Sequence, residues 1–125
     1  MEDGAYTLKK RSALPSSSAI NWASMFMGAG PELHGYTEWG SKTPELPSRE
    51  LNQHGIFPTI FQLLRDARPK AEIGCLYEWN GIKYLVDTLS LNYHYHVADY
   101  NKTPKELGNM ASAYIKEKHP TLVAI

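Results

Sequence analysis

The segment 103–125 constrains the fold more than any other part of the sequence. Thr103, Pro104 and Glu106 have the spacing of a capping box with proline at the first helical position. Apolar residues then recur on one helical face, with lysines and glutamates on the other. The run TLVAI at 121–125 is wholly apolar, which predicts a strand buried on both faces. A helix that leads into such a strand is typical of a parallel sheet covered by helices.

The other segments continue this alternation of strands and helices. A long loop with many Gly, Pro, Ser and Thr residues is expected at 31–55. Strands are expected at 5–14, 71–79, 93–99 and 121–125, and helices at 18–29, 58–69, 81–89 and 103–120. This order predicts an α/β fold with a mostly parallel sheet and helices on both faces, a three-layer sandwich.

The position of the last predicted strand indicates whether residues 1–125 cover a whole catalytic domain. Sites in open α/β sheets lie beyond the carboxyl ends of the strands, and the sequence ends at Ile125 on the last residue of such a strand. We therefore expect residues 1–125 to be the amino-terminal part of a larger catalytic domain. A domain cut at a buried strand exposes apolar surface, so we also expect self-association.

Composition excludes several classes of partner. The 125 residues fit one domain, and 13 basic and 13 acidic side chains give a formal net charge of zero. Without a basic run, neither a nucleic-acid nor an anionic-membrane partner is expected. No apolar run has the length of a membrane span. Cys75 is the only cysteine, which excludes an internal disulfide.

A serine run follows a proline at the start of the first predicted helix. Pro15 is followed by Ser16, Ser17 and Ser18, and Gly28 falls near the end of that helix. A serine at the N-cap can accept a hydrogen bond from a free backbone N–H group, which is a purely structural role. A helix N-terminus also attracts anions, so a serine there could hold or attack a phosphate. The spacing alone leaves both interpretations open.

The longer stretch LPSSSAINWASMFMGAGPELHG, residues 14–35, resembles the nucleophile segment of the alkaline phosphatase superfamily. Its closest resemblance is to the phosphodiesterase and nucleotide pyrophosphatase branch. The matched pattern is a Pro, the nucleophile, an Asn, a helix-ending Gly and a Pro-Glu-x-His-Gly run. Its positions here are Pro15, Ser18, Asn21, Gly28 and residues 31–35. The match requires no gap.

The resemblance implies roles for individual residues. Ser18 would be the nucleophile, forming a covalent phospho-enzyme and binding one of two divalent metal ions, usually zinc. Asn21 would orient the turn or contact a substrate oxygen. Ile20 departs from the family, because many relatives have proline there. Trp39 stands where the diesterase branch has a phosphoryl-binding Asn, so we expect Trp39 to contact substrate in a differently shaped pocket.

The family's metal ligands have no counterpart in this sequence. They come from an Asp before the nucleophile segment, an Asp-x-x-x-His run soon after the position that corresponds to Ile125, and further Asp and His residues downstream. We therefore expect the 125-residue chain alone to be inactive. Relatives are often exported, which makes a periplasmic or extracellular location an expectation from the family.

Other residues with chemical potential have ordinary structural explanations. His94 and His96 share one face of a predicted strand and could bind a metal, but no third ligand is identifiable nearby. His34 is expected to hold its loop, and Cys75 to be a small buried apolar side chain. Three acids form no acid/base pair by spacing: Glu78, Asp87 and Asp99.

The function expected from this sequence is hydrolysis of a small phosphoric ester. The enzyme would be metal-dependent and act through a phospho-serine at Ser18. One alternative is a sulfatase-like or phosphonate-cleaving member of the same superfamily. The formylglycine sulfatase motif contains an Arg that this segment lacks, which weighs against that alternative. Another alternative is a non-catalytic α/β interaction domain in which the serines only cap a helix.

Overall fold

The computed structural model describes residue 4, residues 6–99, residue 101 and residues 103–125. Three strands in this part of the chain form one parallel sheet in the order β2-β1-β3. Their bounds are β1 Ile73–Tyr77, β2 Tyr93–His96 and β3 Leu122–Ala124. The small parallel α/β fold that the sequence predicts is therefore confirmed.

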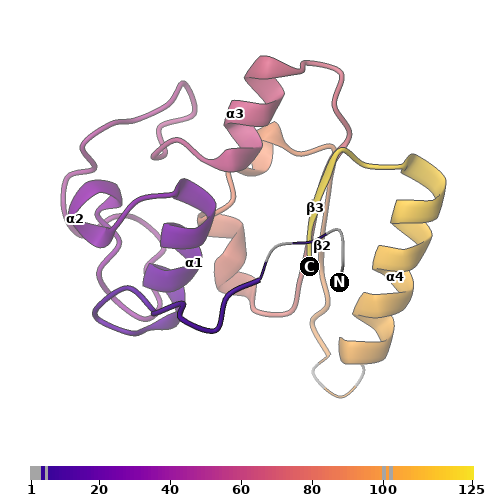
Figure 1. Ribbon diagram of the computed structural model, residues 1–125, viewed down its shortest axis with the longest axis horizontal. Coiled ribbons are helices and arrows are strands. Elements are labelled where there is room, and N and C mark those ends of the chain that lie inside the picture. The colour runs from indigo at the N-terminus through magenta and orange to yellow at the C-terminus, as the bar shows by residue number, and fades with distance from the viewer. Residues whose placement is uncertain (1–3, 5, 100, 102) are drawn as a thin grey trace.

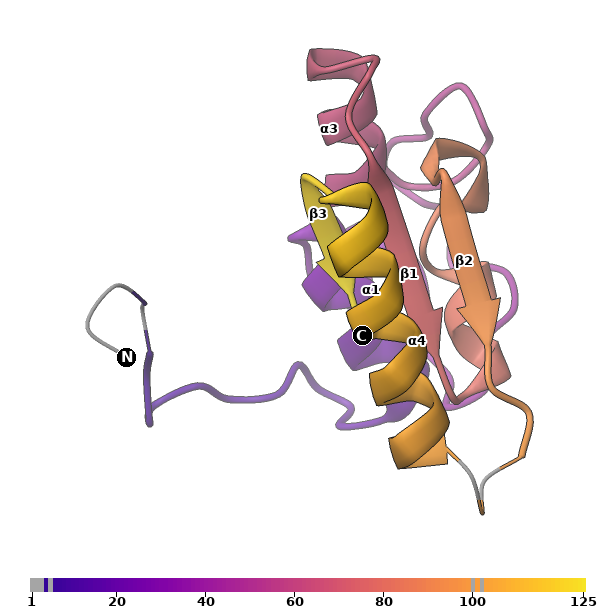
Figure 2. The same ribbon diagram turned by 90° about the vertical axis from the view of Figure 1, so that its right-hand side faces the viewer.

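Helices cover both faces of this sheet. Figure 1 shows α1 and α3 on one side and α4 on the other, and Figure 2 shows α4 lying along the sheet. The α-helices are α1 Ser18–Met27, α2 Pro31–His34, α3 Ile60–Ala67 and α4 Thr103–Lys118. Two short 3-10 helices connect β1 to β2, η1 Asn80–Tyr84 and η2 Thr88–Ser90.

The central strand β1 divides the core into two clusters. All five of its residues are buried, and successive side chains point to opposite faces of the sheet. Ile73, Cys75 and Tyr77 belong to the larger cluster, which includes Phe26 of α1 and Phe61 of α3. Their burial on this face is what holds α1, the helix that begins with Ser18, against the sheet.

The smaller cluster lies under α4. Leu76 packs there with Ala111 and Tyr114. A Cβ atom at Gly74 would lie 2.4 Å from Cε1 of Tyr114, so the aromatic ring rests directly on the backbone of β1. The Tyr114 hydroxyl donates a hydrogen bond of 2.9 Å to Glu72, just before the strand. This contact fixes α4 across the sheet.

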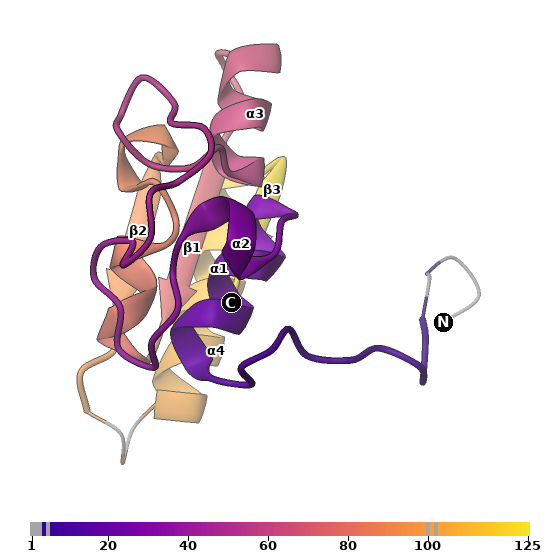
Figure 3. The same cartoon turned by 90° about the vertical axis from the view of Figure 1, so that its left-hand side faces the viewer.

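The strand expected at 5–14 is not formed; residue 5 lies outside the described residues. Residues 6–13 instead run away from the body of the molecule as an exposed arm, as Figures 2 and 3 show. The side chains of Tyr6 and Leu8 are 79% and 93% exposed. An alternating pattern forms a strand only when a neighbouring strand accepts its backbone hydrogen bonds, and neither edge of the described sheet receives this segment.

Three other expectations need correction. Strand β3 is only half-buried rather than buried on both faces, because it has one neighbour, at the edge of the sheet. The helix expected at 81–89 is two 3-10 turns, because Asp87 adopts a left-handed conformation, φ 47°, between them. The side chains of the predicted capping box bind other groups than the helix N–H groups. The Thr103 hydroxyl donates a hydrogen bond to the Asp99 carbonyl, and the Glu106 carboxylate accepts one from the Tyr95 hydroxyl.

The loop after α2 turns at a position that requires glycine. Gly35 has φ +82°, and a Cβ atom there would lie 2.2 Å from the carbonyl oxygen of Leu46. We expect Gly35→Ala to lower the free energy of unfolding by about 1–3 kcal/mol, measured by urea denaturation. Gly108→Ala is the matched control, because Gly108 lies within α4 with open space around it. It should stabilise the protein by about 1 kcal/mol, and equal effects of both substitutions would contradict this explanation.

Candidate active site at the start of α1

The three serines of the run occupy different environments. Ser16 is exposed in the turn, and Ser17 is the N-cap residue of α1. The Ser17 hydroxyl oxygen is buried without a hydrogen-bond partner in the described part of the chain, so the expected capping bond is not made. Ser18 is the first helical residue and is half-buried.

Ser18 faces an open groove of about 590 Å³. Lys10 and Arg11 of the arm form one side of this groove, and Asn21 lies one turn beyond Ser18. The first turn of α1 carries no acidic residue. The helix N-terminus and the two basic residues therefore give the groove a positive electrostatic character.

The carboxamide of Asn21 fixes the chain on both sides of the serine turn. Its Oδ1 accepts a hydrogen bond of 2.7 Å from the N–H of Ala13, and its Nδ2 donates to the carbonyl of Ser17 at 3.0 Å. A longer contact of 3.4 Å joins Nδ2 to the Ala13 carbonyl. Asn21 thus orients the backbone that presents Ser18, which is one of the two roles expected from the sequence.

Trp39 also lies at the start of α1. Its carbonyl accepts a hydrogen bond of 3.3 Å from the N–H of Ala19. Its indole is 66% exposed, and the ring centroid is 6.0 Å from that of Trp79, just after β1. The structure therefore brings together Ser18, Asn21 and Trp39, which the sequence selected.

His34 has a structural environment. Its Nδ1 accepts a hydrogen bond from the N–H of Tyr36 at 3.1 Å, so the ring proton is on Nε2. Nε2 then donates to the hydroxyl oxygen of Ser24, also at 3.1 Å. The ring is fully buried, and this burial lowers the pKa of His34 despite the opposing charge of Glu32. A neutral imidazole in this tautomer cannot take a proton from Ser24.

The two histidines of β2 have separate surroundings. Nε2 of His96 donates to the Glu78 carbonyl at 2.8 Å, and its ring stacks on Tyr77 at 5.6 Å. His94 is exposed. Among the described residues, no group of three or more His, Cys, Asp or Glu side chains is placed to hold a metal ion. Cys75 is buried as expected, which raises the pKa of its thiol to about 12.

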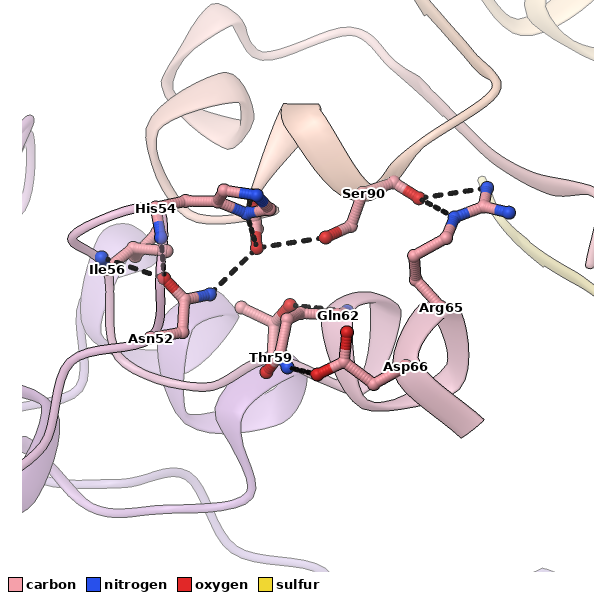
Figure 4. A network of polar contacts seen from close by, with 9 residues as sticks. Asn52, His54, Ile56, Thr59, Gln62, Arg65, Asp66 and Ser90 are labelled. Carbon is pink, nitrogen blue, oxygen red and sulfur yellow. Dashed lines mark hydrogen bonds and ion pairs between the residues drawn. The ribbon is translucent and has the colours of Figure 1, made fainter. Parts of the chain in front are cut away.

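Sequence reasoning missed a polar network centred on Asp87, drawn in Figure 4. Spacing suggested no partner for Asp87, yet both carboxylate oxygens lie 2.9 Å from Nδ1 of His54. The same carboxylate accepts from Nδ2 of Asn52 at 2.8 Å and from the hydroxyl of Ser90 at 3.0 Å. His54 and Asp87 are far apart in the sequence, so no local pattern could have revealed this pair.

This network lies away from Ser18. Arg65 of α3 donates to the carbonyl of Ser90, just before β2, and to the carbonyl of Ala71, just before β1. The network therefore joins loops at the amino ends of the strands, whereas Trp79 near Ser18 follows the carboxyl end of β1. Ligand sites in open α/β sheets lie beyond the carboxyl ends, so the Asp87 cluster is assigned a structural role.

Comparison with models of known protein families, with curated proteins and with solved structures found no match. The similarity to the alkaline phosphatase superfamily therefore stays a prediction. No helix among the described residues is long and apolar enough to cross a membrane.

Replacing Asp87 by Asn tests the structural role of the network. Asn tolerates the left-handed backbone conformation but presents an amide where donors from three residues converge. We expect a loss of about 1–3 kcal/mol in the free energy of unfolding, measured by urea denaturation. Glu117→Gln, at an exposed carboxylate on α4, is the control and should have little effect. An unchanged denaturation midpoint for Asp87→Asn would contradict the assignment.

The pKa of His34 predicts how stability depends on pH. The pKa is lowered from 6.5 in the folded state, so the unfolded chain binds more protons below that pH. The free energy of unfolding should therefore fall as the pH drops below 6.5. In His34→Asn, whose side-chain oxygen can replace Nδ1 as acceptor, the fall should be smaller. Urea denaturation between pH 7.5 and pH 5.5 measures both slopes, and parallel slopes would refute the prediction.

Proposed function

We propose that this chain carries the nucleophile of a phosphoric ester hydrolase, and that the nucleophile is Ser18. The observation that carries the proposal is the placement of Ser18. It is the first residue of α1, it lines an open groove, and its hydroxyl has no hydrogen bond within the described part of the chain. A hydroxyl that is free, half-exposed and at a helix N-terminus can approach a phosphorus atom.

The charges around the groove support an anionic substrate. The N-terminus of α1 contributes partial positive charge, and Lys10 and Arg11, which also line the groove, add two cations. These groups stabilise the negative charge of a phosphoryl group and favour the alkoxide form of Ser18. In the proposed reaction the Ser18 hydroxyl gives its proton to solvent and its oxygen bonds to phosphorus, while the bond from phosphorus to the ester's leaving oxygen breaks and that oxygen takes a proton from solvent. Water then attacks the phospho-serine, the bond between phosphorus and the Ser18 oxygen breaks, and the products are inorganic phosphate and the regenerated Ser18 hydroxyl.

Asn21 and Trp39 have supporting roles in this proposal. The Asn21 carboxamide is engaged with backbone groups of Ala13 and Ser17, so it acts as a positioning residue for Ser18. Trp39 offers an exposed aromatic face beside the helix start. It would contact the organic part of the substrate, because the indole offers a large apolar ring face and only a single N–H donor.

The family resemblance implies two divalent metal ions, but the described residues do not fit a metal site. No three ligating side chains come together among them, and the two histidines of β2 are not joined by a third ligand. No step of the proposed reaction is therefore derived through a metal.

The serine run itself supplies the test of the nucleophile. In the product of the complete reading frame, we expect Ser18→Ala to lower kcat for a nitrophenyl phosphate ester by about a thousandfold or more. Ser16→Ala and Ser17→Ala are matched controls that should keep most of the activity. Rapid quenching and peptide mass spectrometry should locate a phosphoryl group on Ser18. Full activity of Ser18→Ala would refute Ser18 as the nucleophile, whereas no hydrolysis by the unsubstituted protein would leave the interaction-domain alternative.

The 125-residue chain alone should not turn over the same ester. The groove supplies cations and a helix N-terminus, but the described residues supply neither a metal site nor a histidine or carboxylate beside Ser18. Release of nitrophenol by the purified chain with added Zn²⁺ is the measurement, with Ser18→Ala as the blank. Turnover that requires both Zn²⁺ and Ser18 would overturn this expectation.

A further inference from the structure

A second cavity lies beside the groove of Ser18. It has a volume of about 290 Å³ and opens at the carboxyl ends of β1 and β3. It is more enclosed than the groove, and its lining is mainly apolar. The walls come from both sides of the sheet, and five of their residues are Trp22, Phe26, Tyr77, Leu107 and Ala124.

The aromatic walls of this cavity are fixed by their own contacts. The ring of Trp22 stacks on Phe26 with centroids 5.5 Å apart and an interplanar angle of 27°. Trp79, on another wall, is backed by the ring of Trp39 at 6.0 Å. Two indoles that are held in place by neighbouring rings form flat, rigid surfaces, which favour a planar guest.

Trp22 connects the cavity to the groove. It lines both of them, and it lies four residues after Ser18 on α1. Four residues of helix span about 6 Å. A small molecule can therefore reach from the Ser18 hydroxyl to the cavity around a single side chain.

The charges of the two sites differ in sign. Lys10 and Arg11 line the groove, whereas Glu78 is the charged side chain that lines the cavity. An anionic group is attracted to the groove and repelled from the cavity. An amphipathic ester would thus bind in one orientation, with its phosphoryl end at Ser18 and its apolar end against Trp22 and Trp79.

We propose that this cavity binds a planar aromatic group of about two fused rings, carried by the small molecule whose phosphoryl end lies at Ser18. The position of the phosphoryl end rests on the proposed function, but the aromatic site does not. The size agrees with this class of ligand, because an apolar cavity of about 150 Å³ is enough to bind benzene. A fused bicyclic ring has ten ring atoms where benzene has six, so it needs roughly 250 Å³ on the same scale, and the cavity of about 290 Å³ accommodates it.

Binding of 2-naphthol to the 125-residue chain tests the aromatic site directly. NMR should show nuclear Overhauser contacts between naphthol protons and the indole protons of both Trp22 and Trp79. This measurement uses the unsubstituted protein, so it does not depend on a variant that must fold. No binding at millimolar naphthol, or binding without contacts to these two indoles, would overturn the proposal.

A pair of substitutions tests whether the cavity volume is what binds. Ala124→Phe places a ring in the cavity from β3, whereas Ala113→Phe adds the same ring on the exposed face of α4. We expect the first to weaken 2-naphthol binding by about tenfold or more and the second to leave it unchanged. Far-UV circular dichroism verifies that both variants fold. Equal affinities of two folded variants would refute the site.

Comparison of two ligands separates this inference from the proposed function. If both hold, 2-naphthyl phosphate binds more tightly than 2-naphthol, and its phosphorus resonance shifts on binding. If naphthol binds at Trp22 and Trp79 but the phosphate group adds no affinity, the aromatic site stands and the phosphoryl site at Ser18 fails. If 2-naphthyl phosphate binds through its phosphate group and 2-naphthol does not bind, the aromatic site fails and the proposed phosphoryl site at Ser18 stands.

Discussion

The pairing of β1 on both of its edges is the constraint on which this structure depends. Parallel sheets are as a rule covered on both faces, because the crossover helices pack there, and all five residues of the central strand β1 are buried. One face requires α1 and α3, and the other requires α4. The contact between Gly74 and the Tyr114 ring leaves no room for another side chain at that point of the strand. Since α1 is held by this packing, the position of Ser18 follows from the burial of β1.

Sequence patterns predicted the elements whose stability is mainly local or mainly apolar. The helices at α1, α3 and α4 have clear start signals and apolar faces, and β1 and β2 have short apolar or alternating runs. The arm at residues 6–13 was wrongly predicted as a strand because alternation says nothing about whether a neighbour exists. The left-handed backbone at Asp87 likewise depends on His54 and Asn52, which are distant in the sequence.

The candidate site was predictable to the extent that it lies in one contiguous segment. Ser18 and Asn21 are one turn apart on a helix, and their proximity follows from helical geometry. The position of Trp39 beside the helix start is a tertiary fact, which its carbonyl bond to Ala19 establishes. The apolar cavity could not be predicted at all, because its walls come from α1, β1, β3 and α4. Only the packing of the sheet brings those elements together.

The distribution of indoles gives this chain a built-in optical reporter. The protein has three tryptophans, and all of them lie at the same end of the molecule. Trp22 separates the groove from the cavity, Trp79 lines the cavity, and Trp39 packs against Trp79. Tryptophan emission, excited at wavelengths where the eight tyrosines do not absorb, therefore reports on the groove of Ser18 and the neighbouring cavity. A change in emission on mixing with a small molecule would mark an event at this end without any attached label.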